Sequence, residues 1–403
     1  MINSDFLIIG AGIVGLTIAN ELKRRLPKAS IAVIEKESRP GLHSSGRNSG
    51  VLHSGIYYPP NTLKSQVCSQ GSKEMTNYCE ENNLPILKCG KFLISTRQED
   101  EQQIEHLYNN AKKNGISVEK IDQKELKNIE PDVASRSSTA LYVPTTSVAN
   151  SQLVLESIVR DSNHLGVEIF NNMNMIDLNL NAKKIKFNTS DTFSYGHLIN
   201  TAGLHADKIA HKFGVGHRYT ILPFKGIYWE LDPKSDINLN HLIYPVPDLR
   251  VPFLGVHTTL STEGKVYIGP TAIPALGREN YHGLEGINLD DSIDILLSLS
   301  KQMILGKNGF RRLAWNEGRR IFKPWFLSAA QALLPKLKSE HLLPSEKVGI
   351  RAQLYDKNED SLVNDFLVKC GPSSTHVLNA ISPAWTSSFP FARYITDGIL
   401  KRV

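Results

Sequence analysis

The sequence has few cysteines, no long apolar run and no strong excess of charge. Its four cysteines, Cys68, Cys79, Cys89 and Cys370, form no CxxC pair, so neither a zinc site nor a thioredoxin-type redox site is expected. No run reaches the roughly 18 apolar residues of a membrane span, and the first predicted strand leaves no room for a signal peptide. A net charge of +6 over 403 residues is too small to indicate nucleic-acid binding. We therefore expect a cytoplasmic protein without a metal site.

What is present is the composition of a globular enzyme, with 41% hydrophobic and 21% charged residues. The length predicts two domains. Short β-like runs punctuated by Pro and Gly between 220 and 270 predict an antiparallel sheet, and residues 290–335 are predicted to be helical. A closing helix is predicted from about Pro383, and Pro390 would interrupt it.

The order of these elements predicts a discontinuous cofactor domain with a second domain inserted into it. The second domain is expected to be an α+β substrate domain built on an antiparallel sheet. The predicted boundaries are residues 1–85, 145–218 and 345–403 for the cofactor domain, and 86–144 and 219–344 for the substrate domain.

The N-terminus contains a dinucleotide-binding pattern. A predicted strand at 5–10, a helix at 13–26 and a second strand at 30–35 frame Gly10, Gly12 and Gly15. The first glycine permits a tight turn, the second lets the backbone approach a pyrophosphate, and the third allows close helix packing. Glu35 follows twenty residues after the last glycine, where its carboxylate can accept bonds from ribose hydroxyls. This combination predicts a Rossmann-like α/β unit that binds a dinucleotide.

A second turn separates FAD from NAD. Residues 198–203, LINTAG, are predicted to be a strand that ends in small residues. This turn resembles the second cofactor-binding turn of flavoproteins of the two-dinucleotide-binding-domain type. Together with the glycine loop it predicts FAD as the cofactor.

Residues 43–58, HSSGRNSGVLHSGIYY, are poor core material but suit a loop that binds phosphate and flavin edges. The run resembles the flavin-contacting segment of the D-amino-acid-oxidase/glycerol-3-phosphate-dehydrogenase superfamily. Within that superfamily, HSGIYY is most similar to L-2-hydroxyglutarate dehydrogenases and oxidases. The resemblance extends along the chain through GKFLIS at 90–95, LIYPVPDLRVPFLGVHTT at 242–259, GP at 269–270 and GIRAQ at 349–353.

The resemblance implies an FAD enzyme that oxidises an L-2-hydroxy acid, with L-2-hydroxyglutarate as the best single substrate and 2-oxoglutarate as its product. The C2 hydride would pass to flavin N5, and a base would take the hydroxyl proton. A histidine suits that task, and His53 follows the flavin loop directly, so we predict that His53 is the base. A structural or flavin-packing histidine is the alternative.

A dicarboxylate substrate requires cationic groups. Arg351 is the leading candidate because a guanidinium binds a carboxylate bidentately. Gln353 is expected on the same strand face. Lys225 stands where the family leads us to expect Arg, and Trp229 where smaller aromatic residues are usual. The predicted substrate-binding set is Tyr57, Lys225, Arg250, His257 and Gln353. A purely structural role is the alternative for Lys225, Arg250 and His257, and core packing is the alternative for Tyr57.

The cofactor-binding prediction extends to the last segment of the chain. Ser382, Pro383 and Ala384 resemble the family's final cofactor turn, where backbone N–H groups could stabilise reduced flavin. The complete predicted cofactor set is Gly10, Gly12, Ile13, Val14, Gly15, Glu35, Lys36, Ser44, Arg47, Asn48, Ser49, Gly50, Met175, Thr201, Ala202, Gly203, Gly349, Arg351, Ser382, Pro383 and Ala384.

Residues 307–338 combine eight basic residues with Trp315, Phe322, Trp325 and Phe326. Such a stretch could lie on an anionic membrane surface and deliver electrons to a quinone. A packed helical excursion with a solvated basic face is the alternative, and oxygen remains the other candidate acceptor.

Two other functions compete with the main prediction. One is a related FAD oxidoreductase of the glycerol-3-phosphate or amino-acid type. The other is a flavin-binding paralogue without turnover, which the lysine at position 225 and the unusual sequence after Ala384 would suit.

Overall fold

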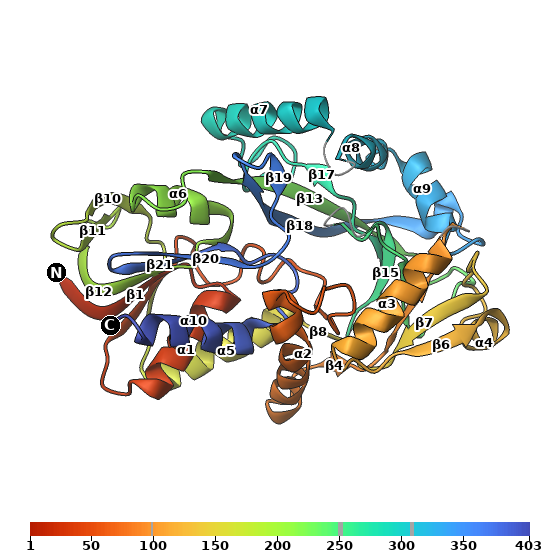
Figure 1. Ribbon diagram of the computed structural model, residues 1–403, viewed down its shortest axis with the longest axis horizontal. Coiled ribbons are helices and arrows are strands. Elements are labelled where there is room, and N and C mark those ends of the chain that lie inside the picture. Colours follow the sequence, from red (N-terminus) through yellow and green to blue (C-terminus); the bar gives the residue numbers. More distant parts are fainter. Residues whose placement is uncertain (98–99, 249–252, 307–309) are drawn as a thin grey trace. The chain divides into compact units, whose positions relative to one another are not determined.

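The computed structural model describes residues 1–97, 100–248, 253–306 and 310–403, which form two compact units (Figure 1). The first unit contains Met1–Asn48, Ser151–Leu222 and Arg351–Val403. The second contains Ser49–Asn150 and Pro223–Ile350. Residues 49–85, which the sequence prediction assigned to the cofactor domain, lie in the second unit.

An eight-stranded sheet forms the centre of the first unit. Strands β1 and β12 pair in parallel, and β2 and β21 extend the parallel part on either side. Their apolar runs are continuous because a parallel strand covered on both faces has no side that meets water. The strands are β1 (Ile2–Ile9), β2 (Ile31–Ile34), β9 (Glu168–Phe170), β10 (Met175–Asn179), β11 (Lys184–Phe187), β12 (Thr192–Asn200), β20 (Leu367–Gly371) and β21 (Ser374–Asn379).

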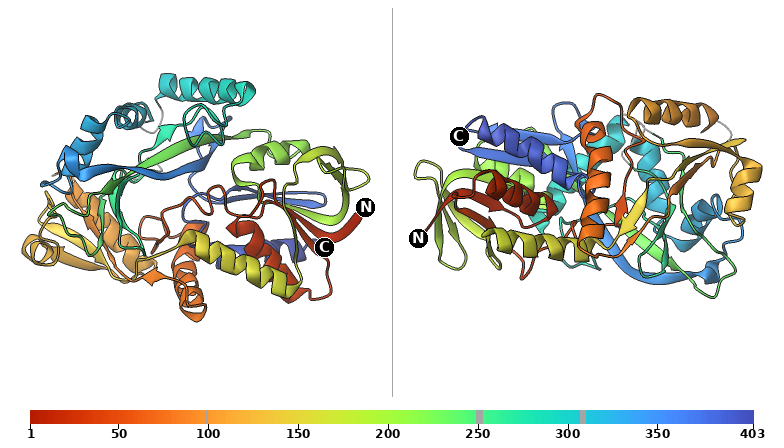
Figure 2. Two further views of the ribbon diagram at one scale, coloured as in Figure 1. Left: turned by 180° about the vertical axis from the view of Figure 1, so that it is seen from behind. Right: turned by 90° about the horizontal axis from the view of Figure 1, so that it is seen from below.

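Helices cover both faces of this sheet. Helix α1 (Ile13–Arg25) lies between α5 (Ser151–Leu165) and α10 (Ser388–Leu400) on one face (Figures 1 and 2). Helix α6 (Ala206–Lys212) packs against β12 and β21 on the other face. On that second face, Ile209 of α6 packs against the apolar cluster that contains Leu7 and Ile34 of the sheet.

The closing helix differs from the prediction. Helix α10 begins at Ser388 rather than near Pro383, so Pro390 lies in its first turn. A proline is tolerated there because the N–H that it lacks would have no partner inside the helix. The expectation that Pro390 would interrupt the helix was therefore wrong.

The second unit contains a four-stranded mixed sheet of order β14–β5–β7–β6. Strand β14 (Leu242–Pro245) pairs in parallel with β5 (Lys91–Ile94), which pairs antiparallel with β7 (Thr139–Val143). The fourth strand is β6 (Glu119–Asp122). Residues 242–245 thus belong to this mixed sheet and not to the antiparallel sheet that the sequence pattern predicted. Their partner strand is about 150 residues away in the chain, beyond the reach of a local pattern.

An antiparallel sheet does form from the rest of that region. It has the order β15–β16–β13–β18–β19, with β17 also on β13, and the boundary between the units falls within β13 and β18. A small third sheet joins β3, β8 and β4. The strands are β13 (Tyr219–Leu231), β15 (His257–Leu260), β16 (Val266–Gly269), β17 (Ile273–Pro274), β18 (Leu342–Asp356), β19 (Ser361–Leu362), β3 (Val51–Leu52), β4 (Ile86–Leu87) and β8 (Ser147–Ala149).

Six helices are described in the second unit. They are α2 (Leu63–Glu81), α3 (Glu101–Lys113), α4 (Gln123–Ile129), α7 (Leu289–Leu305), α8 (Phe310–Arg319) and α9 (Lys323–Gln331). Two apolar clusters form the core, one on each face of β5, with Leu93 in one and Phe92 in the other. Among the described residues, no helix combines the length and the apolar character needed to cross a membrane.

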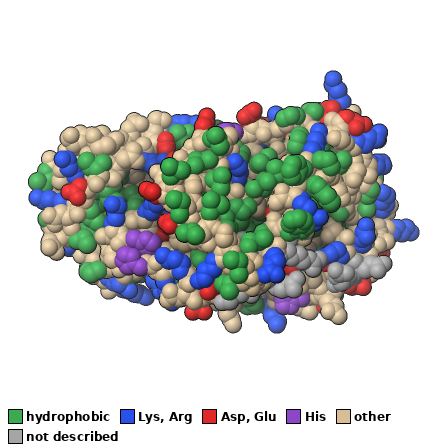
Figure 3. Space-filling model, turned by 90° about the horizontal axis from the view of Figure 1, so that it is seen from above, with side chains coloured by type: hydrophobic (Ala, Val, Ile, Leu, Met, Phe, Trp, Pro, Cys, Tyr) green, Lys and Arg blue, Asp and Glu red, His purple; other side chains and the backbone are tan. Residues whose placement is uncertain are grey.

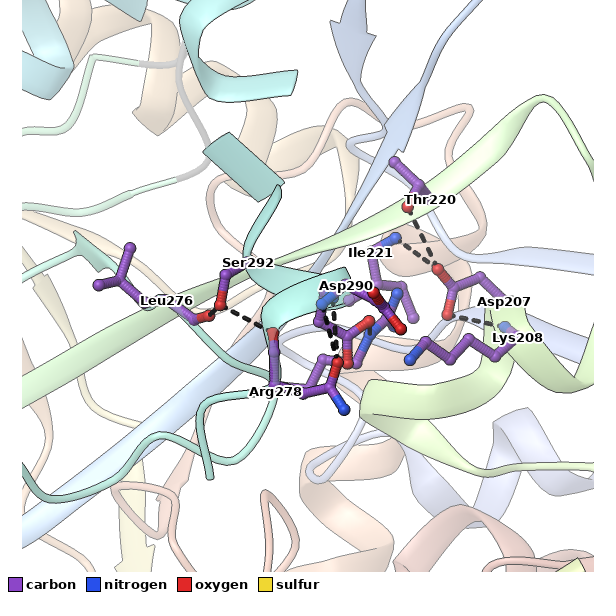
Figure 4. Close-up of polar contacts among 10 residues, drawn as sticks. Asp207, Lys208, Thr220, Ile221, Leu276, Arg278, Asp290 and Ser292 are labelled. Atoms are coloured by element: carbon purple, nitrogen blue, oxygen red, sulfur yellow. Dashed lines mark hydrogen bonds and ion pairs between the residues drawn. The ribbon is translucent and has the colours of Figure 1, made fainter. Parts of the chain in front are cut away.

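In each unit, side-chain hydrogen bonds connect one helix to a neighbouring chain segment (Figure 4). In the first, Asp207 of α6 accepts the backbone N–H of Ile221 at 2.9 Å. In the second, Ser292 of α7 donates to the carbonyl of Leu276 at 2.6 Å. The side chain of Asn288 accepts from the first N–H groups of α7 and thereby caps it.

Candidate functional site

The glycine loop between β1 and α1 is packed too closely for side chains. A Cβ on Gly15 would lie 2.1 Å from the carbonyl oxygen of Gly10 and 2.6 Å from Oγ1 of Thr201. Gly10 itself has a φ of +101°, which favours glycine. Gly12 is the N-cap of α1, so Ile13 and Val14 begin the helix at the loop. The backbone can therefore closely approach a ligand at the positive end of α1.

Glu35 lies directly after β2, and backbone groups orient its buried carboxylate. One oxygen accepts the N–H of Ala11 at 3.0 Å, and the other accepts the N–H of Glu37 at 3.0 Å. Lys36 pairs with Glu37. The acid is thus held beside the glycine loop, where an oxygen lone pair can still accept a hydroxyl.

The serine-rich loop packs against the start of α1. Oγ of Ser45 accepts the N–H of Ile13 at 3.0 Å, and the N-cap glycine leaves room for it. Ser44 precedes this serine. Arg47 donates to the carbonyl of Leu42 at 2.7 Å, and Asn48 donates to the carbonyl of Ser45 at 2.7 Å. These bonds give the loop a defined path at the N-terminus of the helix.

The small-residue turn after β12 lies beside the glycine loop. The hydroxyl of Thr201 donates to the carbonyls of Ile9 and Gly10, each at 3.0 Å. Ala202 and Gly203 then lead into α6, and a Cβ on Gly203 would meet no atom within 4 Å. The carboxyl ends of β1 and β12 therefore meet at one edge of the sheet, where ligands of α/β folds bind.

Met175 lies away from this edge in the sheet order. It begins β10, the outermost strand beyond β11, and packs against the apolar core of the first unit. Two residues earlier, the N–H of Met173 donates to the carbonyl of Glu35 at 2.9 Å. The chain at 173 therefore runs directly past the predicted ribose-binding acid.

The turn before α10 contains Ser382, Pro383 and Ala384, and the start of the helix packs on α1. The hydroxyl of Thr17 in α1 donates to the carbonyl of Ser388 at 3.3 Å. Within the described residues, no partner is found for Nε1 of Trp385 or for the buried hydroxyls of the two serines at 387 and 388. Such buried polar atoms fit a neighbouring polar ligand or water.

Arg351 and Gln353 lie at the end of β18 in the first unit, and Gly349 precedes them in the second. Arg351 is partly exposed, whereas Gln353 is fully buried. The amide of Gln353 donates to the carbonyl of Val363 at 2.9 Å and so ties β18 to the segment after β19. The two side chains therefore differ in exposure although they lie two residues apart.

His53 follows β3 in the second unit, after Ser49 and Gly50. The Sγ of Cys68 donates to its carbonyl oxygen at 3.2 Å, which fixes the backbone, while the side chain is partly exposed. Tyr57, four residues on, is buried.

The other predicted substrate residues of this unit lie on different strands. His257 stacks on Tyr244 with ring centroids 3.9 Å apart, and its Nδ1 lies 2.8 Å from the carbonyl of Gly255. Lys225 of β13 donates to Oδ1 of Asn280 at 3.3 Å, and burial lowers its pKa. Arg250 lies outside the described residues.

Comparison with known proteins identifies the family. Residues 5–398 match the family described as FAD dependent oxidoreductase. The chain belongs to this family. It is 33% identical to L-2-hydroxyglutarate dehydrogenase of Escherichia coli strain K12, over 98% of this chain and 93% of that protein. It is 32% identical to the mitochondrial L-2-hydroxyglutarate dehydrogenase of Homo sapiens, over 99% of this chain and 89% of that protein.

Solved structures of two oxidases show the same fold. The FAD-bound L-alpha-glycerophosphate oxidase of Mycoplasma pneumoniae has a TM-score of 0.78 at 20% identity, covering 99% of this chain and 95% of that chain. Glycine oxidase of Geobacillus kaustophilus has a TM-score of 0.74 at 14% identity, covering 100% and 96%. The predicted fold class, a parallel cofactor-binding sheet with an antiparallel substrate-domain sheet, is thereby confirmed.

FAD is the cofactor of this FAD-dependent oxidoreductase, as it is throughout the family. The first unit fits this group because Gly10, Gly12 and Gly15 leave a cradle that a Cβ would fill. The carboxylate of Glu35 and the small-residue turn at Thr201 border the same cradle.

The sequence reasoning missed two features. It chose Ser44 within the serine-rich loop, whereas Ser45 is the residue that contacts the start of α1. Only a contact in space distinguishes the two serines, because either suits such a loop. It also passed over Lys91 in GKFLIS, whose buried position is visible only in the fold.

Proposed function

We propose that this FAD-dependent oxidoreductase oxidises an L-2-hydroxy acid, with L-2-hydroxyglutarate as its best substrate and 2-oxoglutarate as the product. The similarity of nearly the whole chain to L-2-hydroxyglutarate dehydrogenases of a bacterium and an animal is the observation that supports this most strongly. On this proposal, the first unit is the cofactor domain and the second is the substrate domain.

The protein would contribute a base and carboxylate-binding cations. Bound FAD would supply the acceptor, at its N5 atom, for the hydride from C2 of the substrate. His53 takes the hydroxyl proton as the base. The hydrogen bond from Sγ of Cys68 to its carbonyl oxygen holds its backbone in place, which is consistent with this role. Arg351 binds the carboxylate next to the reacting carbon. Lys225, Arg250 and His257 are further substrate-binding candidates.

We propose two further sets of cofactor contacts, one in the turn before α10 and one in the serine-rich loop. The backbone of Ser382–Ala384 stabilises the cofactor near the start of α10. The serine-rich loop that contains Arg47 and Asn48 contacts the cofactor at the start of α1.

Anaerobic mixing with substrate tests the proposal. We expect L-2-hydroxyglutarate to bleach the oxidised-flavin absorption band rapidly and its D enantiomer to leave the band unchanged. Glycerol 3-phosphate and L-amino acids are the control substrates, because they represent the related oxidase activities. No bleaching by any 2-hydroxy acid would contradict the proposal. Near-normal reduction of a His53→Ala variant would contradict only the assignment of the base.

We also propose that the second unit contacts an anionic membrane and passes electrons to a quinone there. The side chains of Trp315, Phe322 and Trp325 are 63%, 64% and 52% exposed. Arg319 lies over the rings of both tryptophans. Figure 3 shows a face on which basic side chains are scattered among hydrophobic ones. Membrane-surface segments combine such groups.

The adjoining helix α7 enlarges this surface. Ile293, Leu297 and Ile304 are exposed along it, and Arg311 of α8 donates to the carbonyls of its last turn. The basic side chains favour an anionic, cytoplasmic leaflet. We expect salt-sensitive co-sedimentation with phosphatidylserine vesicles and none with phosphatidylcholine vesicles. A Trp315→Ser/Trp325→Ser variant should bind less. Equal recovery in the supernatant with both lipids would rule out the membrane contact, leaving oxygen as the favoured acceptor.

A further inference from the structure

A lysine occupies a core position of strand β5. Successive residues of a strand alternate between its two faces, so Lys91 and Leu93 share one face and Phe92 and Ile94 the other. Leu93 belongs to the apolar cluster that contains Tyr57 and Tyr244. Lys91 is 0% exposed, although lysine is almost never fully buried without a partner. Its ammonium therefore requires an explanation.

The surroundings of Lys91 satisfy its charge only in part. Its Nζ lies 4.7 Å from the ring centroid of Tyr57 and 5.3 Å from that of Tyr244. Cation–π contacts of this kind attract the charge but accept none of the three N–H bonds in the usual geometry. Within the residues that the structure describes, Nζ has no hydrogen-bond partner. Burial accordingly lowers the pKa of Lys91 to about 8.

Other buried polar groups without partners lie in Tyr57, whose ring Lys91 faces, and in chain segments that pair near β5. Within the described part of the chain, they are the hydroxyls of Tyr57, Ser54 and Thr146. The backbone brings these segments together, because Leu52 pairs with Ser147 and the N–H of Gly90 donates to the carbonyl of Thr146 at 2.9 Å. Native proteins leave few buried polar groups unpaired. Together, these hydroxyls and the ammonium of Lys91 offer several hydrogen-bond donors and one positive charge. An anion with several acceptor oxygens could bind all of them.

We propose that Lys91 and Tyr57 form a subsite for the distal carboxylate of a dicarboxylic substrate. This inference rests on the proposed function and deepens it by naming the residues that bind the second carboxylate of its substrate. The ammonium and the phenol donate to the carboxylate, and the tyrosine ring turns to admit it. His53 follows β3, whose Leu52 pairs with Ser147, the residue after Thr146, so the chain segment of the proposed base pairs with that of Thr146. The apolar cluster around Lys91 then packs against the methylenes of the substrate.

The test compares two substrates that differ only at the distal end. L-2-hydroxyglutarate and L-2-hydroxyvalerate have the same carbon chain, but the second lacks the distal carboxylate. In a Lys91→Met variant of the FAD-loaded protein, we expect kcat/KM for L-2-hydroxyglutarate to fall by roughly 100-fold, as expected for loss of a hydrogen bond between charged groups. The value for L-2-hydroxyvalerate should be unchanged. Equal losses for both substrates would refute the subsite.

Calorimetric titration with glutarate, which cannot be oxidised at C2, gives a readout independent of turnover. Glutarate should bind wild-type protein and bind Lys91→Met roughly 100-fold more weakly. Equal affinities would also overturn the proposal. If neither hydroxy acid reduces wild-type protein, the proposed function fails, whereas this titration still decides on the subsite.

Lys347 provides the matched control. Its Nζ also lies over two tyrosine rings, those of Tyr228 and Tyr267, at 5.7 and 4.4 Å, and burial lowers its pKa to about 8 as well. Unlike Lys91, it is partly exposed. Lys347→Met should leave both substrates and glutarate unaffected. A loss of glutarate binding in this variant equal to that in Lys91→Met would overturn the assignment to Lys91.

A wild-type measurement covers the case in which Lys91→Met fails to fold. Glutarate affinity should decline as the pH rises above about 8, because the free ammonium then loses its proton. Three titratable groups face it, Cys68, Tyr57 and Tyr244, and burial raises the pKa of both tyrosines. The tyrosines therefore stay neutral in this range. A pH-independent affinity between pH 7 and 9.5 would refute the subsite.

Discussion

Replacing Gly15 by alanine should expel FAD without unfolding the protein. Its Cβ would lie 2.1 Å from the carbonyl oxygen of Gly10 and 2.6 Å from Oγ1 of Thr201. Ordinary contact requires roughly 3.5 Å, so one or both groups must move by about 1 Å. The same carbonyl accepts the hydroxyl of Thr201, so the glycine loop and the small-residue turn shift together.

The size of the effect follows from this overlap. An added methyl group in a tightly packed site costs about 1–3 kcal/mol of unfolding free energy. Loss of one hydrogen bond from the loop to a phosphate costs about 1.5–3 kcal/mol of binding free energy, or about 10- to 150-fold in affinity. We therefore expect purified Gly15→Ala to contain little FAD and its apoprotein to melt several degrees below wild-type apoprotein.

Gly398 of α10 provides the control, since it lies in a helix of the same unit and its added Cβ would meet no atom within 4 Å. Gly398→Ala should retain full FAD content and gain up to about 1 kcal/mol, because alanine favours helix. The assays are the ratio of flavin to protein absorbance, fluorescence titration of apoprotein with FAD, and thermal unfolding. Wild-type FAD affinity in Gly15→Ala would refute the reasoning from close packing.

Two further predictions concern the first unit. Burial lowers the pKa values of His197 and His376 to about 4, so the unfolded chain, with pKa values near 6.5, binds protons first as the pH falls. Stability should therefore decrease between pH 6.5 and 4 by up to about 3 kcal/mol per histidine, as measured by denaturant unfolding, and His197→Gln should reduce this decrease. An unchanged pH dependence in the variant would contradict the burial argument. Glu35→Gln places an amide donor against an N–H of Ala11 or Glu37 and should weaken FAD binding at least about 10-fold in fluorescence titration; equal affinity would contradict the role of the carboxylate.

The cofactor half of the fold is readable from the sequence because its signals are local. The spacing of Gly10, Gly12 and Gly15 between a strand and a helix records a steric requirement within fifteen residues of chain. Glu35 follows at the end of the next strand for the same reason. The start of α10 was misplaced because Ser382–Ser388 are all compatible with a turn or with a helix start, and packing against Thr17 decides between them.

The second unit is less readable because its organisation depends on distant pairings. Residues 242–245 are one of the short β-like runs that predicted an antiparallel sheet, yet their partner is β5 in a parallel pair. The unit boundary is equally non-local, since Val51 and Leu52 continue the serine-rich loop in sequence but pair with β8. Candidate substrate-binding residues on such strands can be predicted from residue type, but the residues that surround them follow only from the fold.

Lys91 shows that the role expected for a residue from its sequence can change once its burial is known. In sequence, a lysine at the start of KFLI indicates a strand end in water, whereas the fold places its ammonium in an apolar cluster. Replacing a buried charge by an apolar side chain of similar volume removes a desolvation cost of roughly several kcal/mol and loses roughly 0.5–2 kcal/mol of cation–π attraction. If Lys91 serves the substrate, Lys91→Met should be at least as stable as wild type in ligand-free denaturant unfolding and yet lose glutarate binding. If its role were structural, stability and glutarate binding would decline together.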